Sequence, residues 1–235
     1  MNEEDSETHK SHEFYSAFSN AAYYDTTDEK LSHLKKHGLN KNDEWEIDEE
    51  VAPQGTNNDR TIFRRKKKDS DGYDVIFTNR GTSQTRNLLP DLGIMFGGEE
   101  HTSRYRKLKT DFQKTKDKYS NADDTIVSSG HSLGGNQSVF LNRKFGVESH
   151  AFNPGASLSH MKQGFVSRLA CWANPNWSSC KQADKSHIYH TPGDPLSTAS
   201  LFGRDHKHIF RSKKDQYNPH AMTAFHHKDY KKSQE

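Results

Sequence analysis

The chain has 235 residues, of which 30% are hydrophobic and 28% charged, and its mean hydropathy is -1.12. This composition suits one polar domain, and no run approaches the roughly 20 consecutive apolar residues of a transmembrane helix. The formal net charge of +2 is too balanced for wholesale binding to nucleic acid, so no nucleic-acid partner is expected. The first residues carry no secretory or transit signal, which makes an intracellular location the default expectation. The oligomeric state stays open.

The chain is predicted to form one domain between two polar tails. Residues 1–10 are expected to be a disordered acidic tail, 11–228 a single α/β domain, and 229–235 a Lys-rich tail. Two cysteines, Cys171 and Cys180, are too few for a disulfide scaffold; a local disulfide and two thiols both remain open.

The first predicted elements are two helices and a hairpin. Aromatic and small residues recur at helical spacing after Ser11, which predicts an opening helix. A second helix is expected over 28–37, ending at Gly38, because glycine tolerates a left-handed cap. Strand-like stretches at 60–64 and 73–77, joined by a turn-rich segment, predict a hairpin.

The middle of the chain alternates between helix and strand signals. A single apolar stripe predicts a helix over 103–119, and a short apolar run at 125–128 predicts a strand buried on both faces. Three further strands are expected at 149–152, 187–190 and 208–210. This alternation predicts a mostly parallel sheet flanked by helices.

The motif that carries most of the chemistry is Gly130-His131-Ser132-Leu133-Gly134-Gly135. It follows the predicted strand at 125–128 and precedes a predicted helix over 133–144. In this context G-x-S-x-G predicts a strand-to-helix turn that holds the serine in a strained conformation with its hydroxyl exposed. Only glycine fits two residues before and two after that serine. The alternative is a tight turn with a structural role alone.

A serine nucleophile needs a histidine base and a carboxylate that orients the histidine. In hydrolases with this turn, the acid and then the histidine follow the serine along the chain. Asp194 lies just after a predicted strand, and His220 lies at the start of the last predicted helix. His206 and His208 are the main rivals for the base.

Two backbone N–H groups are predicted to stabilise an oxyanion. Leu133 begins the helix after the serine, so its N–H points toward developing negative charge. Thr82 follows the end of a strand at Arg80-Gly81 and offers a second N–H, and its hydroxyl as well. An ordinary exit from a strand is the alternative at Thr82.

These motifs together resemble those of a known family. Arg80-Gly81-Thr82, the serine motif, Asp194-Pro195 and His220 are similar to the class 3 lipases, the fungal-type triacylglycerol lipase family of the α/β-hydrolases. The resemblance covers about residues 73–225 and is greatest to compact lipase-like members. It implies an α/β-hydrolase fold, here preceded by an N-terminal helical segment.

The resemblance also implies a role for each site residue. Ser132 would be the nucleophile, Asp194 the orienting acid and His220 the base. Thr82 and Leu133 would donate to the oxyanion. No metal ion or other cofactor is expected for turnover, because a serine triad supplies its own nucleophile and the histidines lack the His-Glu-x-x-His spacing of a zinc hydrolase.

The resemblance assigns residues 83–98 to a lid. This segment is rich in apolar residues that are not readily assigned to the core, and such residues next to an active site suit a fatty-acyl chain. A core helix with a short loop is the alternative. Two positions depart from the family pattern: Asn79 stands where an aromatic is usual, and Leu88 where tryptophan is usual. Both departures concern the substrate more than the catalytic residues.

The sequence therefore predicts a serine hydrolase that cleaves carboxylic esters of lipids, as a lipase or phospholipase A1 does, through an acyl-enzyme on Ser132. The alternatives are an esterase or thioesterase acting on small soluble substrates, and an inactive structural protein with a lipase fold. The expected partner is the lipid or ester substrate. The basic run 64–68 could contact an anionic membrane surface, or be a solvated turn.

Overall fold

The computed structural model describes residues 3–42, 44–53, 59–81, 103–154, 185–191, 194, 206–211, 222 and 231–232. Within them, eight strands form one sheet in the order β1 to β8. The strands are β1 (Glu46–Ile47), β2 (Arg60–Lys66), β3 (Tyr73–Asn79), β4 (Thr125–His131), β5 (Glu148–Phe152), β6 (Ser186–His190), β7 (His206–Arg211) and β8 (Lys231–Lys232). The helices are α1 (Glu3–Ala21), α2 (Thr27–Lys36), α4 (Ser103–Lys118) and α5 (Leu133–Phe145).

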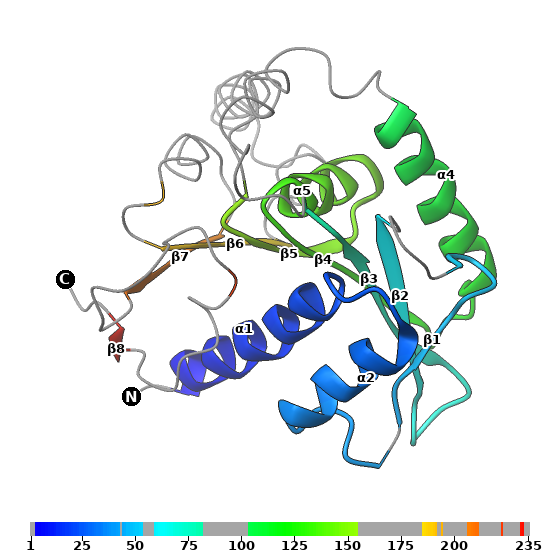
Figure 1. The fold of residues 1–235 in the computed structure, drawn as a ribbon, viewed down its shortest axis with the longest axis horizontal. Helices are drawn as coiled ribbons and strands as arrows, with labels where there is room; N and C mark the ends of the chain where they lie inside the picture. Colours follow the sequence, from blue (N-terminus) through cyan, green and yellow to red (C-terminus); the bar gives the residue numbers. More distant parts are fainter. Residues whose placement is uncertain are drawn as a thin grey trace.

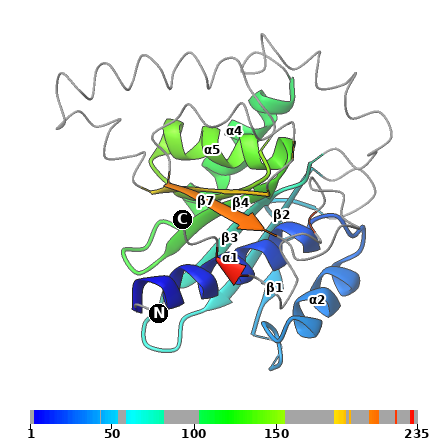
Figure 2. The same cartoon turned by 90° about the vertical axis from the view of Figure 1, so that its left-hand side faces the viewer.

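The sheet is mostly parallel and lies between two layers of helices. Strands β3 to β7 are parallel neighbours, whereas β1, β2 and β8 pair in antiparallel fashion at the edges. Helices α1 and α2 cover one face, and α4 and α5 cover the other (Figures 1 and 2). The predicted α/β architecture with a mostly parallel sheet is confirmed.

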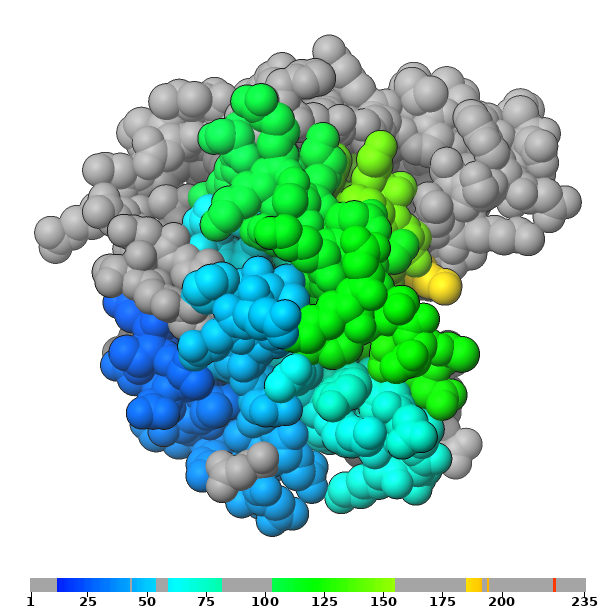
Figure 3. Space-filling model, turned by 90° about the vertical axis from the view of Figure 1, so that its right-hand side faces the viewer, coloured from blue at the N-terminus to red at the C-terminus, as the bar shows by residue number. Residues whose placement is uncertain are grey.

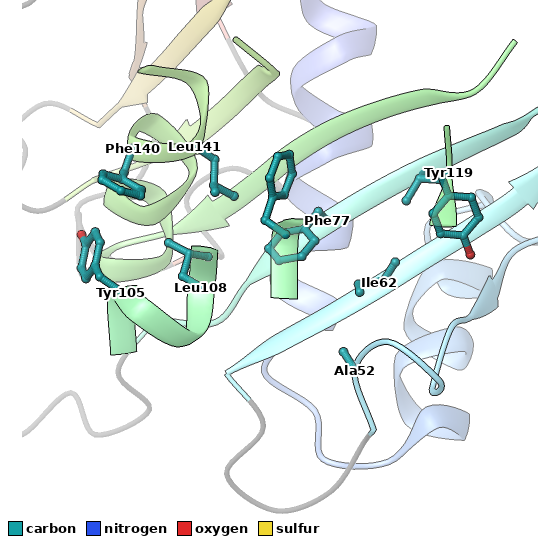
Figure 4. Packing of buried hydrophobic residues seen from close by; sticks show 10 residues of the cluster. Ala52, Ile62, Phe77, Tyr105, Leu108, Tyr119, Phe140 and Leu141 are labelled. Carbon is teal, nitrogen blue, oxygen red and sulfur yellow. The ribbon is translucent and has the colours of Figure 1, made fainter. Parts of the chain in front are cut away.

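One hydrophobic core fills the space between the sheet and α4 with α5 (Figure 4). Side chains alternate along a strand, so Val75 and Phe77 of β3 face this core while Ile76 faces the other side. The ring of Phe77 packs edge to face on Phe112 of α4, with centroids 5.1 Å apart. Tyr105 packs in the same way on Phe140, which joins α4 to α5.

A second core lies under α1. Phe18 is fully buried, and its ring packs against Trp45 at 4.8 Å and Phe63 at 5.0 Å between centroids. Helix α2 continues this layer and begins at a capping box, in which the Thr26 and Glu29 side chains each accept from the other residue's backbone N–H. The N-terminal third of the chain, outside the family resemblance, is therefore part of the domain core.

Most of the predicted helices and strands are confirmed, with boundaries that agree within a few residues. The opening helix is an exception, because α1 begins at Glu3 rather than after Ser11, so residues 3–10 are helical where a disordered tail was expected. Acidic residues in its first turn favour this start, since negative charge stabilises a helix N-terminus. Strands β1 and β8 were missed because two residues show no periodicity.

The C-terminal prediction differs in the same way. Lys231–Lys232 pairs with Phe210 and Arg211 of β7, although 229–235 was expected to be a plain polar tail. Among the described helices, none combines the length and apolar character needed to cross a bilayer.

Phe18→Ala should lower the free energy of unfolding by about 3–5 kcal/mol, because it removes a ring from the centre of the core under α1. Chemical denaturation measures the loss. Tyr24→Ala is the control, since that ring is 40% exposed, and its effect should be much smaller. Equal effects would mean that α1 does not share the domain core.

Candidate active site

Ser132 lies in the sharp turn between β4 and α5. Its φ and ψ are 56° and −123°, a conformation that residues with a side chain rarely adopt. Its N–H donates to the Phe152 carbonyl over 3.0 Å, and its carbonyl accepts from the Asn136 N–H over 3.1 Å. The end of β5 and the first turn of α5 thus hold the strained serine in place. The strand-to-helix turn predicted at 130–134 is therefore present, and it is called the elbow below.

The glycines around the serine are dictated by close backbone contacts. A Cβ atom at Gly130 would lie less than 3.0 Å from the carbonyl group of Gly134, and one at Gly134 would collide with the Asn79 carbonyl. Both collisions are with backbone, which cannot rotate away. The prediction that only glycine fits two residues before and two after Ser132 is therefore confirmed.

The serine is buried in the structure, with 2% of its surface exposed, where the sequence predicted an exposed hydroxyl. Gly81, at the exit of β3, lies against it: a Cβ at Gly81 would be 3.3 Å from the Ser132 Cβ and 2.7 Å from the His131 carbonyl oxygen. The described residue nearest to it at the exit of β3 is therefore Gly81, which packs directly against the elbow.

Of the two oxyanion donors predicted from the sequence, the structure describes Leu133 and not Thr82. Leu133 is the first residue of α5, and the first N–H groups of a helix have no carbonyl partner within the helix. Its position is that of the predicted donor, and its role at the oxyanion stays a prediction. Thr82 lies outside the described residues, although its neighbour Gly81 is beside Ser132. The contribution of Thr82 stays a prediction.

The exit of β3 is fixed by hydrogen bonds to Arg80. Its N–H donates to the Asp59 carbonyl over 2.8 Å, and its guanidinium pairs with Asp25 at 3.0 Å. Its carbonyl accepts from the Arg104 guanidinium over 2.8 Å. Contacts from three distant segments thus set the direction in which the chain passes Ser132.

Tyr23 is a site residue that the sequence analysis missed. It follows α1, and its hydroxyl lies 2.8 Å from Nδ1 of His131, the residue before the serine. The Gly81 backbone also hydrogen-bonds this hydroxyl, while burial raises the Tyr23 pKa and keeps it protonated. Tyr23 therefore joins the α1 layer, the exit of β3 and the elbow. Since 108 positions separate it from His131, no local pattern could have revealed it.

Asp194 is buried, with 1% of its surface exposed, and follows the end of β6. Its N–H donates to the Thr191 carbonyl over 3.3 Å. Because β4, β5 and β6 are parallel neighbours, their carboxyl ends lie at the same end of the sheet. Asp194 and Ser132 therefore both lie at the carboxyl end of the parallel strands, two strands apart.

Asn153, a second residue missed from the sequence, fastens the loops at this end of the sheet. Its φ of 40° lies in the left-handed region, which asparagine tolerates better than most residues. Its side-chain oxygen accepts from the Thr191 N–H over 2.9 Å, and its amide donates to the Thr191 hydroxyl over 3.0 Å. The start of the loop that carries Asp194 is thereby tied to the end of β5.

The predicted base, His220, lies outside the described residues, so its contact with Ser132 stays a prediction. The rivals His206 and His208 lie on β7, three strands from β4 in the sheet. At about 4.8 Å per strand, their backbone is about 14 Å from β4. Which of the three histidines serves as the base stays a prediction.

Asn79 stands where the class 3 lipase pattern usually has an aromatic residue. Its buried amide donates to the hydroxyls of Ser128 on β4 and Ser138 on α5, at 3.3 and 3.1 Å. Asn79 thus links β3, β4 and α5 beneath the elbow by hydrogen bonds, whereas an aromatic side chain at this position would contribute only apolar contact. Leu88 and the predicted lid, 83–98, lie outside the described residues, as do Cys171 and Cys180.

The basic run 64–68 lies at the end of the β2–β3 hairpin, the cyan part of the face in Figure 3. Every one of its five cations pairs with a carboxylate within 4.0 Å, and the partners are Glu44, Glu46, Asp71 and Asp74. These carboxylates reduce the positive charge that the run presents. Contact with an anionic membrane stays a prediction.

Comparison with known proteins supports the fold. The chain is similar to the nonglycosylated LIP2 lipase of Yarrowia lipolytica, with a TM-score of 0.53 and 12% identity over 93% of this chain and 84% of that one. A mutant form of MDLA from Penicillium cyclopium gives the same TM-score and identity over 92% of this chain and 83% of that one. The chain has the α/β-hydrolase fold. No family model and no curated protein matches it, so membership of the class 3 lipases stays a prediction.

Gly134→Ala should destabilise the protein by about 1–3 kcal/mol or more, because its methyl group would collide with the Asn79 carbonyl. Gly135→Ala is a matched control in the same helix turn. Its nearest neighbours, at 3.2 Å, would have to shift by only a few tenths of an ångström, and alanine favours helix, so its cost should be smaller. Thermal unfolding of the two variants measures the difference. Equal stability would contradict the tight elbow packing.

Proposed function

We propose that the protein is a serine hydrolase that cleaves carboxylic esters of lipids, as a lipase or phospholipase A1 does. The observation that carries the proposal is the strained backbone of Ser132 at a glycine-bounded turn between a parallel strand and a helix. Strained residues of this kind cluster at active sites. The fold shared with a Yarrowia lipolytica lipase supports the same reaction class.

The proposed reaction proceeds through an acyl-enzyme. His220 removes the proton of the Ser132 hydroxyl as its oxygen attacks the ester carbonyl, and Asp194 stabilises the imidazolium that forms. The N–H groups of Leu133 and Thr82 donate to the oxyanion of the tetrahedral intermediate. His220 then protonates the leaving alkoxide, and water releases the acyl group by the reverse steps.

The lipid substrate is proposed from the apolar residues of the lid, 83–98. Each methylene group of an acyl chain that leaves water contributes about 0.8 kcal/mol, so an apolar cover selects long chains. An esterase on small soluble substrates would share the same catalytic residues. An inactive protein would keep the fold without turnover, but it would have no need to maintain a strained serine.

Ser132→Ala should abolish labelling by a fluorophosphonate and lower ester hydrolysis at least about 10³-fold, because the nucleophile is lost while packing changes little. His220→Ala should show the same loss of hydrolysis. Labelling on a gel and initial rates with a p-nitrophenyl ester measure the two effects.

Three control variants make this test specific. Ser129→Ala removes a buried serine three residues earlier on β4 and should keep the label, as should His206→Ala and His208→Ala. Equal labelling of Ser132→Ala would overturn the assignment of the nucleophile. Loss of hydrolysis in a rival histidine variant, with His220→Ala active, would move the base to β7.

Replacing Leu92 and Phe96 by serine should lower hydrolysis of aggregated long-chain glycerolipid more than hydrolysis of a soluble short ester. An open lid exposes apolar side chains that a lipid surface accepts and water disfavours. The measurement is the ratio of the two rates in wild type and double variant. An unchanged ratio with both rates intact would favour the small-ester esterase.

A further inference from the structure

A second group of ionisable side chains lies on the α1 face of the sheet, at the ends of β5 and β6 that are opposite to the elbow. Glu148 and His150 are two residues apart on β5 and therefore point to the same face. His187 on β6 is the register partner of His150. One ligand atom from each residue lies within 4.8 Å of the other two.

We propose that Glu148, His150 and His187 form a binding site for a first-row divalent transition metal, represented here by Zn²⁺. Two imidazole nitrogens and one carboxylate oxygen are a donor set suited to zinc, and three protein ligands leave a fourth position for water. Neither the elbow chemistry nor the family resemblance uses these residues.

The side chains around His150 already orient its ring as a metal ligand requires. Its Nδ1 lies 3.0 Å from the Tyr189 hydroxyl, so a proton on Nδ1 directed at that oxygen would leave Nε2 for the ion. A ligating histidine ordinarily has such an outer partner on its other nitrogen. The ring of Tyr15 stacks on the imidazole with centroids 3.7 Å apart, and His150 is 1% exposed. The hydrogen bond at Nδ1 and the stacked Tyr15 ring together fix the orientation of the imidazole.

The position facing Nε2 is where the ion would bind. There the Glu148 Oε1 lies 2.9 Å from Nε2, a distance that one shared proton bridges. When an ion binds, the neutral ring carries its one proton on Nδ1, directed at Tyr189, instead of on Nε2, and the carboxylate and imidazole both donate electron pairs to the ion. Zinc–ligand distances of about 2.0–2.1 Å place ligand atoms about 3.3 Å apart. The 2.9 Å pair of Glu148 and His150 would therefore widen slightly, while atoms up to 4.8 Å apart would approach by at most about 1.5 Å.

The two residues that have to move, Glu148 and His187, are less buried than His150. The rings of His150 and His187 are nearly parallel, at 12° and 4.9 Å between centroids, whereas an ion must lie in the plane of both rings. His187, which is half-buried, would have to turn, while His150 stays fixed. The Glu148 side chain is 42% exposed, which opens the cluster to ions from solvent.

The ion would hold β5 to β6 and take no part in ester cleavage. Glu148 is the first residue of β5, and Phe152, whose carbonyl accepts from the Ser132 N–H, is the last. At about 3.3 Å per residue, about 13 Å separates the two ends of the strand. The proposal is therefore independent of the proposed hydrolase activity and compatible with turnover that needs no metal.

Titration calorimetry of the full chain with Zn²⁺, after treatment with a chelator, tests the site. Wild type should bind one equivalent that is lost, or weakened at least about 100-fold, in His187→Ala and in Glu148→Gln. Tyr189→Phe should weaken it about tenfold, because the outer partner of His150 is removed. Mg²⁺ should not bind at this donor set.

His37→Ala is the matched control. It removes an exposed histidine whose ring centroid lies 4.5 Å from that of His33. Two histidines four residues apart can bind zinc adventitiously, so this variant tests for such binding. This variant should keep the equivalent. Loss of the equivalent in His37→Ala, or unchanged affinity in His187→Ala, would overturn the proposal.

Two further measurements make the result independent of folding defects. Zn²⁺ should raise the melting temperature of wild type but not that of His187→Ala, whose circular dichroism without metal should match wild type. Anomalous scattering from a zinc-soaked crystal should place the ion about 2.0–2.1 Å from His150 Nε2. An ion found only at other residues would show adventitious binding and refute the site. Fluorophosphonate labelling of Ser132 reports separately on the hydrolase.

Discussion

The backbone of Ser132 is the constraint on which the rest of the site depends. A non-glycine residue at a φ of 56° costs on the order of 1–3 kcal/mol and persists only where its surroundings enforce it. The enforcing groups come from three consecutive strands: the Asn79 carbonyl at the end of β3, Gly130 in β4 and the Phe152 carbonyl at the end of β5. The parallel order of these strands thus fixes the serine.

The N-terminal helix, which carries no family resemblance, takes part in both sites. At one end of the sheet it leads to Tyr23, whose hydroxyl contacts His131 beside the nucleophile. Farther along its length, Tyr15 stacks on His150 in the proposed metal site. Between them, the Ser19 hydroxyl bonds that of Ser129 on β4. Losing α1 would therefore uncover polar side chains as well as the apolar core around Phe18.

The parts of the site that the sequence could predict are those written in local patterns. The alternation of elements predicts the sheet, and a hexapeptide predicts the elbow at Ser132 and the N–H of Leu133. Tyr23 and Asn153 escaped because they act on partners 108 and 38 positions away, and a single sequence contains no trace of such pairs. The pairing of His150 with His187 was missed for the same reason, because the two residues become neighbours only through the register of β5 and β6.

The low hydrophobic content of the chain explains why its interior is so polar. With 30% hydrophobic residues, the fold buries serines, histidines and asparagines on the inner strands, and each such group is costly unless it has a hydrogen-bond partner. Asn79 with Ser128 and Ser138, Asn153 with Thr191, and His150 with Tyr189 are partnered in this way. Because hydrogen bonds are directional, they fix the positions of the strand ends and the orientations of the rings more closely than apolar packing would. The polar interior therefore supplies the geometry for the proposed chemistry at both ends of β5.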